Sequence, residues 1–346
     1  MWNRVFRWTN VLLILFTLIV YLVPWVDPKS FWPIALLGPS YPWLLLLHAG
    51  FIIFWIVLRK AYFLMSLTCV LLGWTYLSSI FSFQFPQSGD EADLRVMSYN
   101  INVFQGLMFN DEAEAAKRQN SFRSFMASLE PLDVFCTQEC PERFTRWLAR
   151  ELNFPYHYTV RGTTILSRHP FLVQGGLNFD NSNNSVTWAD IEVKSHRLRV
   201  YSVHLQSNSI TSEAKRLRAS GDLQERETWV GIKGILRKYR NATQKRADQA
   251  EQLLQHITQS PYPVVVCGDM NDTPVSYVYK RIGQDSGLVD TFRKKGSGAG
   301  FTYGGILPAL RIDYILTDPK LGVLNYDRYK KSFSDHFPIL CELKIQ

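Results

Sequence analysis

The stretch Val264-Val265-Val266-Cys267-Gly268-Asp269-Met270-Asn271 indicates both how this chain folds and where its chemistry lies. It opens with four apolar residues, three of them β-branched, a pattern typical of a buried strand. The apolar run stops at Gly268, and a carboxylate follows at once. Because a buried strand ends at the edge of its sheet, we expect Asp269 and Asn271 to lie at an exposed edge.

Two further acidic groups follow or interrupt short apolar runs in the last third of the chain. They stand in Arg311-Ile312-Asp313-Tyr314 and in Ser334-Asp335-His336. Three carboxylates placed in this way, one of them beside a histidine, are hard to explain as solvated surface. The pattern predicts an active site.

Short apolar runs alternate with helix-like segments from Leu94 onward. The predicted strands are 94–99, 133–137, 163–167, 198–203 and 264–267, and the predicted helices are 113–129 and 244–259. Polar residues follow three of these strands: Asn100, Glu139 and His204. The alternation predicts an α/β fold with polar groups gathered at strand ends.

The first 90 residues differ in composition from the rest, because they hold only five of the 38 Lys and Arg residues and two of the 30 Asp and Glu residues. Three apolar stretches there predict membrane spans at about 8–26, 42–58 and 61–83, near the length that crosses a bilayer core of roughly 30 Å. A cleaved signal peptide is disfavoured, since no small-residue cleavage site follows the first stretch. We therefore expect a transmembrane region over 1–87 and a catalytic domain over 92–346.

The positions of basic residues predict the orientation of these spans. Arg4 and Arg7 precede the first span, and Arg59 and Lys60 lie between the second and third. The positive-inside rule then places the amino terminus in the cytoplasm. Three crossings leave the catalytic domain on the extracytoplasmic side of the plasma (inner) membrane.

The five cysteines show neither zinc-site nor redox-motif spacing. Cys267 and Cys341 lie in apolar, strand-like runs, which predicts core thiols. The net charge of +8 is too weak by itself to require a nucleic-acid partner.

Six short motifs occur in order along residues 94–346 and together resemble the endonuclease/exonuclease/phosphatase superfamily, with its DNase I-like and neutral sphingomyelinase-like members. They are Ser98-Tyr99-Asn100-Ile101-Asn102, Gln138-Glu139, Ser202-Val203-His204-Leu205, Gly268-Asp269-Met270-Asn271, Arg311-Ile312-Asp313-Tyr314 and Ser334-Asp335-His336. The resemblance implies a four-layered α/β sandwich, with two mixed sheets flanked by helices. In the chain it follows the amino-terminal bundle of about three transmembrane helices that the apolar stretches predict. The resemblance also implies metal-dependent hydrolysis of a phosphoester.

By the same resemblance, Glu139 is the direct metal ligand, Asn100 supports it and Asp335 approaches it. Asn102 stands where many relatives have Asp or another polar residue, and is a further candidate. Mg²⁺ is the expected ion, with Mn²⁺ or Ca²⁺ as alternatives, because hard cations prefer oxygen ligands.

The resemblance also implies roles around the phosphate. Asp269 orients or deprotonates the attacking water, and Asn271 contacts the phosphate. His336 stabilises the phosphoryl oxygens and is held by Asp335. His204 lies near the leaving group, with Asp313 as its orienting partner, although Arg311-Ile312-Asp313-Tyr314 could instead be an ion-paired strand.

A basic segment lies between His204 and Asp269. Residues 212–246 contain ten Lys and Arg residues and four Asp and Glu residues. Within them an apolar stripe of Trp229, Ile232, Leu236 and Tyr239 recurs at helical spacing, with basic residues that include Lys233 and Arg237 on other faces. A basic amphipathic helix predicts contact with a membrane surface or an anionic substrate. The alternative is an ordinary helix covering the sandwich, with its basic face solvated.

The favoured hypothesis is a membrane-anchored, Mg²⁺-dependent phosphodiesterase acting on a lipid headgroup, like a phospholipase C or sphingomyelinase. A membrane-anchored DNase I-like nuclease and a phosphatase of a phosphoinositide-like monoester are the alternatives. A non-catalytic binding module is disfavoured because Glu139 and Asp269 are both present. The expected partners are the bilayer and a phosphoester, lipid rather than nucleic acid, with no obligate protein partner.

Overall fold

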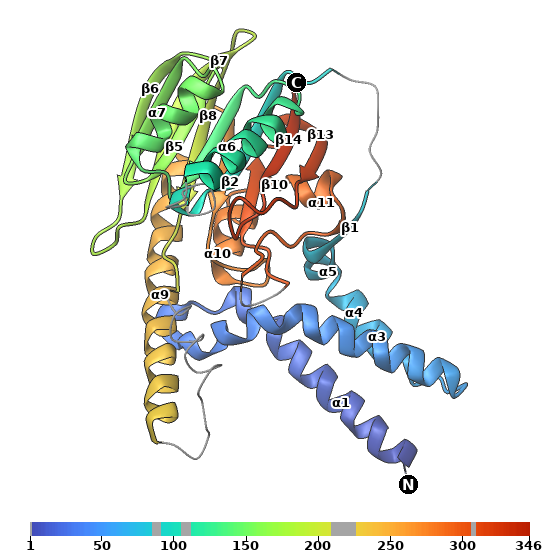
Figure 1. The fold of residues 1–346 in the computed structure, drawn as a ribbon. Coiled ribbons are helices and arrows are strands. Elements are labelled where there is room, and N and C mark those ends of the chain that lie inside the picture. The colour runs from blue at the N-terminus through green and yellow to red at the C-terminus, as the bar shows by residue number, and fades with distance from the viewer. Residues whose placement is uncertain (1, 85–90, 105–111, 209–225, 306–308) are drawn as a thin grey trace. The chain divides into compact units, whose positions relative to one another are not determined.

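The computed structural model describes residues 2–84, 91–104, 112–208, 226–305 and 309–346 (Figure 1). The chain divides into two compact units. The first unit comprises Met1–Phe81, Asn208–Ala247 and Asp272–Lys280, and the second comprises Ser82–Ser207, Asp248–Asn271 and Arg281–Gln346. The domain boundary predicted at residue 87 and the part of the basic segment at 212–225 lie outside the described residues.

The second unit contains two six-stranded mixed sheets among its described residues. One sheet has the order β13 (Leu321–Arg328), β14 (Ile339–Ile345), β2 (Leu94–Asn100), β3 (Val134–Gln138), β5 (Thr163–Ser167) and β4 (Tyr156–Val160). The other has the order β10 (Val289–Asp290), β12 (Asp313–Thr317), β9 (Val264–Asp269), β8 (His196–His204), β7 (Ser185–Val193) and β6 (Phe171–Asn178). Each sheet has one parallel pair, β2 with β3 and β8 with β9.

The two sheets pack face to face through a shared apolar core. Inward-facing residues of β2, β3 and β5 meet those of β7, β8 and β9 in one cluster, with Val96, Cys136 and Val265 among its members. All five cysteines of the chain are buried and unpaired, which confirms the predicted core thiols. Alternation of buried side chains along each strand supplies this core.

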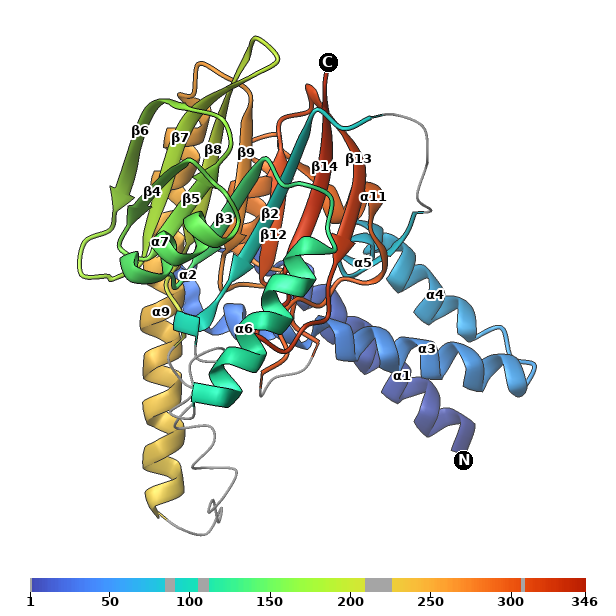
Figure 2. The same ribbon diagram turned by 45° about the horizontal axis from the view of Figure 1, so that its top comes forward.

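Helices cover the outer faces of the sandwich. Two helices, α6 (Glu112–Ala127) and α7 (Glu142–Glu151), lie over the first sheet (Figure 2). They bury Phe122 and Leu148 in a second apolar cluster. On the other sheet, the last turns of α9 (Arg226–Thr258) place His256 Nδ1 2.9 Å from Tyr201 Oη. The shorter elements are β11 (Ser297–Ala299), α11 (Thr291–Lys295) and η4 (Lys280–Gln284). The predicted four-layered sandwich is thus confirmed.

The first unit contains the apolar amino-terminal helices. These are α1 (Trp2–Val20), η1 (Val23–Trp25), α2 (Pro28–Phe31), η2 (Trp32–Ser40), α3 (Tyr41–Val57), α4 (Phe63–Leu72) and α5 (Trp74–Ile80), and the unit also includes α10 (Tyr277–Tyr279). By length and composition, Trp2–Trp25 and Pro28–Val57 are each able to cross a membrane.

The third predicted span, 61–83, is wrong as a single helix. It breaks at Gly73 with a bend of 78° between α4 and α5, and residues Phe81–Phe83 form a strand, β1. A side chain at Gly73 would have its Cβ 2.0 Å from Tyr21 Oη, so packing of the tyrosine against the break explains the glycine. The bent pair counts as a third span only if both helices cross together.

Candidate active site

The carboxyl ends of both parallel strand pairs lie at one edge of the second unit. In the first sheet Asn100 is in register with Gln138, and Glu139 follows directly. In the second sheet His204 is in register with Asp269, and Asp313 begins the antiparallel neighbour opposite Asp269. Sheet topology therefore gathers these side chains, which are separated by up to 213 positions in sequence between Asn100 and Asp313.

Asn100 joins the two halves of the site. Its Nδ2 donates to Asp269 Oδ2 at 3.0 Å and to Glu139 Oε1 at 3.3 Å. Its Oδ1 accepts from the backbone N–H of Asn102 at 3.0 Å. Because Asn100 is fully buried, these bonds fix the carboxylates of the two sheets relative to each other.

Several site residues have backbone conformations that are uncommon for L-amino acids. Glu139, Asn102 and Asn271 have φ values of 52°, 45° and 51°. Gly268 has φ 145°, and a Cβ there would lie 2.0 Å from Val203 O. Such conformations cluster where the surrounding structure imposes a particular arrangement of side chains.

His336 is held by Asp313. Its Nδ1 lies 3.0 Å from Asp313 Oδ2 and 3.1 Å from Oδ1, and its Nε2 lies 3.7 Å from Asp269 Oδ2. The prediction that Asp335 holds His336 is wrong, since Asp335 Oδ1 instead accepts from Asn102 Nδ2 at 2.9 Å. Although Asp335 and His336 are consecutive, their side chains contact different partners, Asn102 and Asp313.

His204 has different neighbours from those predicted. Its Nε2 lies 3.6 Å from Glu139 Oε1 and 3.9 Å from Asp269 Oδ2, so the predicted pairing with Asp313 is wrong. This nitrogen is buried and has no hydrogen-bond partner within the described part of the chain. An unsatisfied buried polar atom next to two carboxylates indicates a place for a ligand.

Asn271 completes the loop after β9. Its backbone N–H donates to Asp269 Oδ1 at 2.8 Å, and its Nδ2 donates to Leu205 O at 3.0 Å. The side chain thus ties the end of β9 to the residue that follows His204. It lies beside the predicted catalytic carboxylate, as expected for a residue near the phosphate.

The two histidines differ in protonation. Burial lowers the pKa of His204, which keeps its ring neutral at neutral pH. Burial also opposes protonation of His336, but Asp313 and Asp269 outweigh it and raise the pKa of that ring to about 10. Burial likewise raises the pKa of Asp269 to about 6 and raises the pKa of Glu139. One histidine is therefore a cation and the other a neutral donor or acceptor.

Among the described residues, Asp269, Asp313 and His336 form a group whose ligand atoms lie within 4.8 Å of one another. By distance this group could hold a metal ion. Its histidine, however, is bonded to Asp313 through Nδ1 and favours the protonated form, which has no lone pair to offer a metal. Glu139 offers the more suitable oxygen atoms, and Asn100 holds its carboxylate in place.

Three supporting residues were not predicted. Thr302 Oγ1 accepts from the backbone N–H groups of Ile312 and Asp313, both at 3.0 Å. Ser334 Oγ donates to Asn100 O at 2.8 Å, and the Tyr303 ring packs edge-on against His336 with centroids 5.1 Å apart. Ser334 lies in a recognised motif, whereas Thr302 and Tyr303 lie in an irregular segment with no periodic signal.

The predicted surface residues belong to a different unit from the residues described above. Trp229, Lys233 and Arg237 lie on the part of α9 that belongs to the first unit. Arg311 is fully buried and makes two hydrogen bonds to Asp290, at 2.8 and 2.6 Å, so this part of its motif is structural.

Comparison with family models agrees with this geometry. Residues 97–336 match the model described as "Endonuclease/Exonuclease/phosphatase family". Residues 3–80 match a domain of unknown function, DUF8431. Among curated proteins, no sequence matches this chain.

Solved structures show a similar fold. An endonuclease/exonuclease/phosphatase from Bacteroides vulgatus has a TM-score of 0.52 at 17% identity, covering 73% of this chain and 99% of its own. Humanized D. rerio TDP2 has a TM-score of 0.53 at 20% identity, covering 72% and 98%. The human Nocturnin catalytic domain, solved with a bound sulfate anion, has a TM-score of 0.51 at 18% identity, covering 75% and 97%. At these identities the likeness concerns the fold alone.

Proposed function

Because this chain belongs to the endonuclease/exonuclease/phosphatase family, whose members hydrolyse phosphoesters, we propose that it is a membrane-anchored, metal-dependent phosphodiesterase of lipid headgroups. The observation that carries the proposal is the arrangement around Asn100. This residue joins Glu139 to Asp269, and Asp269 lies beside one cationic and one neutral histidine. Hydrolysis of a phosphodiester uses a carboxylate to handle the attacking water, a positive charge beside the phosphoryl oxygens and a hydrogen-bonding group for the leaving oxygen.

The charges of the site fit a hard metal ion. Among the described residues, the carboxylates of Glu139, Asp269, Asp313 and Asp335 outnumber the imidazolium of His336, so these groups together repel an anionic phosphoester. Glu139 would hold the ion, supported by Asn100 and with Asp335 nearby, and Mg²⁺ suits such oxygen donors, with Mn²⁺ or Ca²⁺ as alternatives. When bound, the ion would neutralise charge on the phosphate oxygens.

Different residues of the chain then act on the attacking water, the phosphoryl oxygens and the leaving oxygen. Asp269 orients the attacking water and accepts its proton, and Asn271 beside it contacts the phosphate. His336, kept cationic by Asp313, stabilises the negative charge that develops on the phosphoryl oxygens. His204 Nε2, neutral and unsatisfied in the described residues, hydrogen-bonds the leaving oxygen.

Contacts within the first unit support an anchored enzyme with a defined topology. Tyr239 Oη, on α9, donates to Ala35 O at 2.8 Å, and Lys280 Nζ lies 4.4 Å from the centre of the Trp25 ring. Trp25 and Ala35 both lie in the segment between α1 and α3. The segments that follow His204 and Asn271 in the chain therefore emerge on the same side of the membrane as this segment.

The same reasoning gives α4 and α5 a role as the third crossing. The Arg7 guanidinium, near the start of α1, lies 5.7 Å from the centre of the Tyr62 ring, which precedes α4. Tyr76, on α5, stacks on Tyr21 at 5.0 Å, beyond the end of α1. Helices α4 and α5 together thus run in the same direction as α1, from the end near Arg7 to the end near Tyr21. With the amino terminus in the cytoplasm, the catalytic domain lies on the extracytoplasmic side.

The exposed face of α9 favours an anionic lipid surface. Trp229, Lys233 and Arg237 are spaced four residues apart, so they share one face of the helix, and all three are exposed. Residues 228–247 contain six Lys and Arg residues and no Asp or Glu. Tyr239, predicted to share the apolar stripe, is instead buried on the opposite face. An exposed face that mixes Trp with basic residues suits the interface of a bilayer.

The test is a substrate screen with the full-length protein purified in detergent. We expect Mg²⁺-dependent hydrolysis of a phospholipid diester, lowered at least 100-fold by Asp269→Ala or His336→Ala, as for loss of a general acid–base group. His196→Ala, an exposed histidine at the far turn of β7 and β8, is the matched control and should retain activity. Cleavage of DNA without any lipid turnover would favour the nuclease hypothesis and reject the lipid one.

A further inference from the structure

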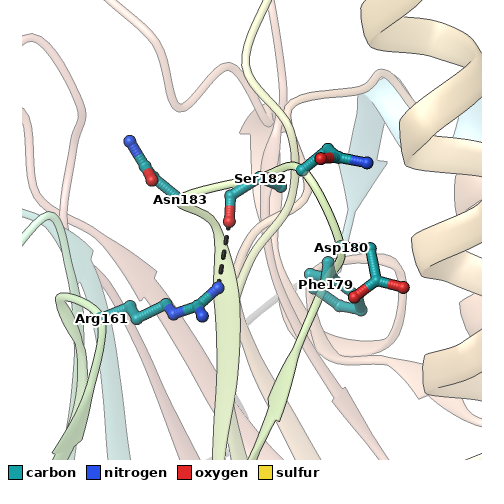
Figure 3. Close-up of a pocket in the computed structure, with 6 residues that line it drawn as sticks. Arg161, Phe179, Asp180, Ser182 and Asn183 are labelled. Carbon is teal, nitrogen blue, oxygen red and sulfur yellow. Dashed lines mark hydrogen bonds between the residues drawn. The ribbon is translucent and has the colours of Figure 1, made fainter.

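A cleft of about 590 Å³ lies in the second unit, and none of the catalytic side chains lines it. Figure 3 shows the residues that do. Its lining consists of Arg161, Phe179, Asp180, Asn181, Ser182 and Asn183. Arg161 comes from the turn between β4 and β5, and the other five come from the connection between β6 and β7. The two walls therefore belong to different sheets.

Both walls are directly connected to the catalytic edge. Next to Arg161, Gly162 O accepts from the backbone N–H of Cys140 at 2.8 Å, and Cys140 follows Glu139. At the other wall, Asn184 Nδ2 donates to Leu205 O at 3.0 Å, the same carbonyl that Asn271 binds. These bonds tie both walls to the segments that follow Glu139 and His204, so the cleft adjoins the catalytic edge.

Hydrogen bonds hold the walls in place. Arg161 donates from Nη1 to Ser182 O at 3.1 Å, which brings its guanidinium to the opposite wall (Figure 3). Ser182 Oγ donates to Gln206 Oε1 at 3.0 Å, two residues beyond His204. Ser185 Oγ donates to Val160 O at 2.7 Å, at the base of the turn that carries Arg161. The cleft is thus framed before any ligand binds.

Arg161 occupies a position that local structure does not favour for arginine. Val160 pairs with Thr163, so Arg161 and Gly162 form a two-residue turn, with φ values of 44° and 85°. Turns with both central φ values positive strongly prefer Asn-Gly. The arginine side chain is therefore better explained by what its guanidinium contacts than by the turn.

The chemistry of the lining indicates the ligand. Arg161 and Asp180 balance in charge, and Asn181 and Asn183 add amide donors and acceptors. A second phosphate would find no excess positive charge here and would meet the carboxylate of Asp180. Adjacent hydroxyl groups, by contrast, can donate to a carboxylate or an amide oxygen and accept from a guanidinium.

We propose that this cleft binds the vicinal hydroxyls of a polyol headgroup, such as glycerol, inositol or a sugar, and that Arg161 determines this specificity. The inference rests on the proposed phosphodiesterase function and narrows its substrate class. It distinguishes polyol headgroups from choline, which has no hydroxyl groups to offer once esterified. The same chemistry could come from a membrane lipid or from a soluble glycerophosphodiester.

The first arm of the test measures binding without turnover. The full-length protein carrying Asp269→Asn is titrated calorimetrically with sn-glycero-3-phosphoinositol, with and without Arg161→Asn. We expect Arg161→Asn to weaken binding about tenfold or more, as for loss of a charged hydrogen bond, and Arg161→Lys to have a smaller effect. Since Asn suits the turn, the thermal unfolding midpoint should be unchanged or raised, which excludes misfolding as the cause.

The second arm measures selectivity in the otherwise native enzyme. The ratio of kcat/KM for phosphatidylinositol over phosphatidylcholine in mixed micelles should fall at least about tenfold in Arg161→Asn. Lys194→Asn is the matched control, because Lys194 occupies the same kind of positive-φ, two-residue turn between β7 and β8. It should keep the ratio of the unsubstituted enzyme. Turnover of glycerophosphoinositol as fast as that of phosphatidylinositol would identify a soluble source, and slower turnover a lipid source.

Two outcomes separate this inference from the function on which it rests. Undiminished binding of glycerophosphoinositol in Arg161→Asn, or an equal loss on phosphatidylcholine, would overturn the polyol subsite while leaving the phosphodiesterase intact. Arg161-dependent binding without hydrolysis of any phosphoester would overturn the proposed function and retain the subsite.

Discussion

At the scale of single residues, the protonation of each histidine in the site depends on how close the nearest carboxylate lies. Asp313 lies within hydrogen-bond distance of His336, and its charge raises the pKa of that ring to about 10 despite burial. His204 lies 3.6 Å or more from the nearest carboxylate oxygen, so burial outweighs these charges and lowers its pKa. Two like side chains therefore carry different charges for a geometric reason.

A double-mutant cycle tests this pairing. Asp313→Asn should lower kcat by about 10²- to 10⁴-fold because His336 loses the partner that keeps it cationic. Combining Asp313→Asn with His336→Asn should cost little more than either change alone, since both remove the same function. If the losses in kcat were additive for that pair but non-additive for Asp313→Asn with His204→Asn, Asp313 would be the orienting partner of His204 instead.

A substitution at Gly268 tests whether the fold requires the backbone conformation just before Asp269. Its φ of 145° and the 2.0 Å approach of a built Cβ to Val203 O leave no room for a side chain. We expect Gly268→Ala to destabilise the fold by at least about 2 kcal/mol, measured by thermal unfolding. Gly283→Ala is the control, because its Cβ would meet only Leu316 Cδ1 at 3.6 Å. Equal stability of the two variants would contradict this account.

The sequence predicted the members of the site better than their partners. Short motifs located Glu139, Asp269 and His336, because each lies at a strand end or in a distinctive tripeptide. The pairing of Asp313 with His336 depends on the register of β12 against β9 and on the loop that carries Thr302. Register between distant strands leaves no local signal, so this part could not be predicted.

At the scale of elements, apolar periodicity predicted five of the twelve strands in the two sheets, together with α6 and the end of α9. The helix expected at 244–259 is the end of a continuous helix from Arg226 to Thr258. The predicted third span is not one continuous helix, because it bends by 78° at Gly73, where Tyr21 packs against the break. Hydropathy measures how apolar a stretch is, and contains no information on a bend that depends on a contact with another helix.

The exposed face of α9 yields a prediction about lipid charge. Replacing Lys233 and Arg237 together with Gln should weaken the apparent affinity for micelles containing anionic lipid by up to about 30-fold, since each basic residue near such a surface contributes about 1 kcal/mol. Lys294→Gln with Lys320→Gln removes the same charge from the second unit and should have little effect. Equal loss on micelles of purely neutral lipid would argue for a structural role of this face.

The end of α9 gives a prediction about pH and stability. Burial, followed by the charge of Arg199, lowers the pKa of His256 below its ordinary value of 6.5. The unfolded chain therefore binds a proton more readily, so the stability that depends on neutral His256 is present above pH 6.5 and declines as the pH falls below it. Thermal unfolding of His256→Gln should show a weaker decline between pH 7 and pH 5 than the unsubstituted protein. A parallel decline in both would contradict the assignment.

At the scale of the whole molecule, the first unit is assembled from three separate parts of the chain. The amino-terminal helices are joined by Asn208–Ala247 and by Asp272–Lys280, which follow His204 and Asn271 respectively. Composition had divided the chain into a membrane region followed by a catalytic domain. It could not predict that later segments return to the first unit, because contacts such as that of Tyr239 with Ala35 span 204 positions.

These contacts predict a specific topology, which cysteine labelling can test. Lys29 lies in the segment between α1 and α3, Lys60 lies between α3 and α4, and Lys320 lies in the second unit. A membrane-impermeant maleimide should label Lys29→Cys and Lys320→Cys in intact cells and Lys60→Cys only after lysis, provided that α4 and α5 together cross the bilayer. All five native cysteines are buried, so background labelling should be low. Labelling of Lys60→Cys and Lys320→Cys on the same side would mean that α4 and α5 do not cross, and that the contact between Tyr239 and Ala35 must be reinterpreted.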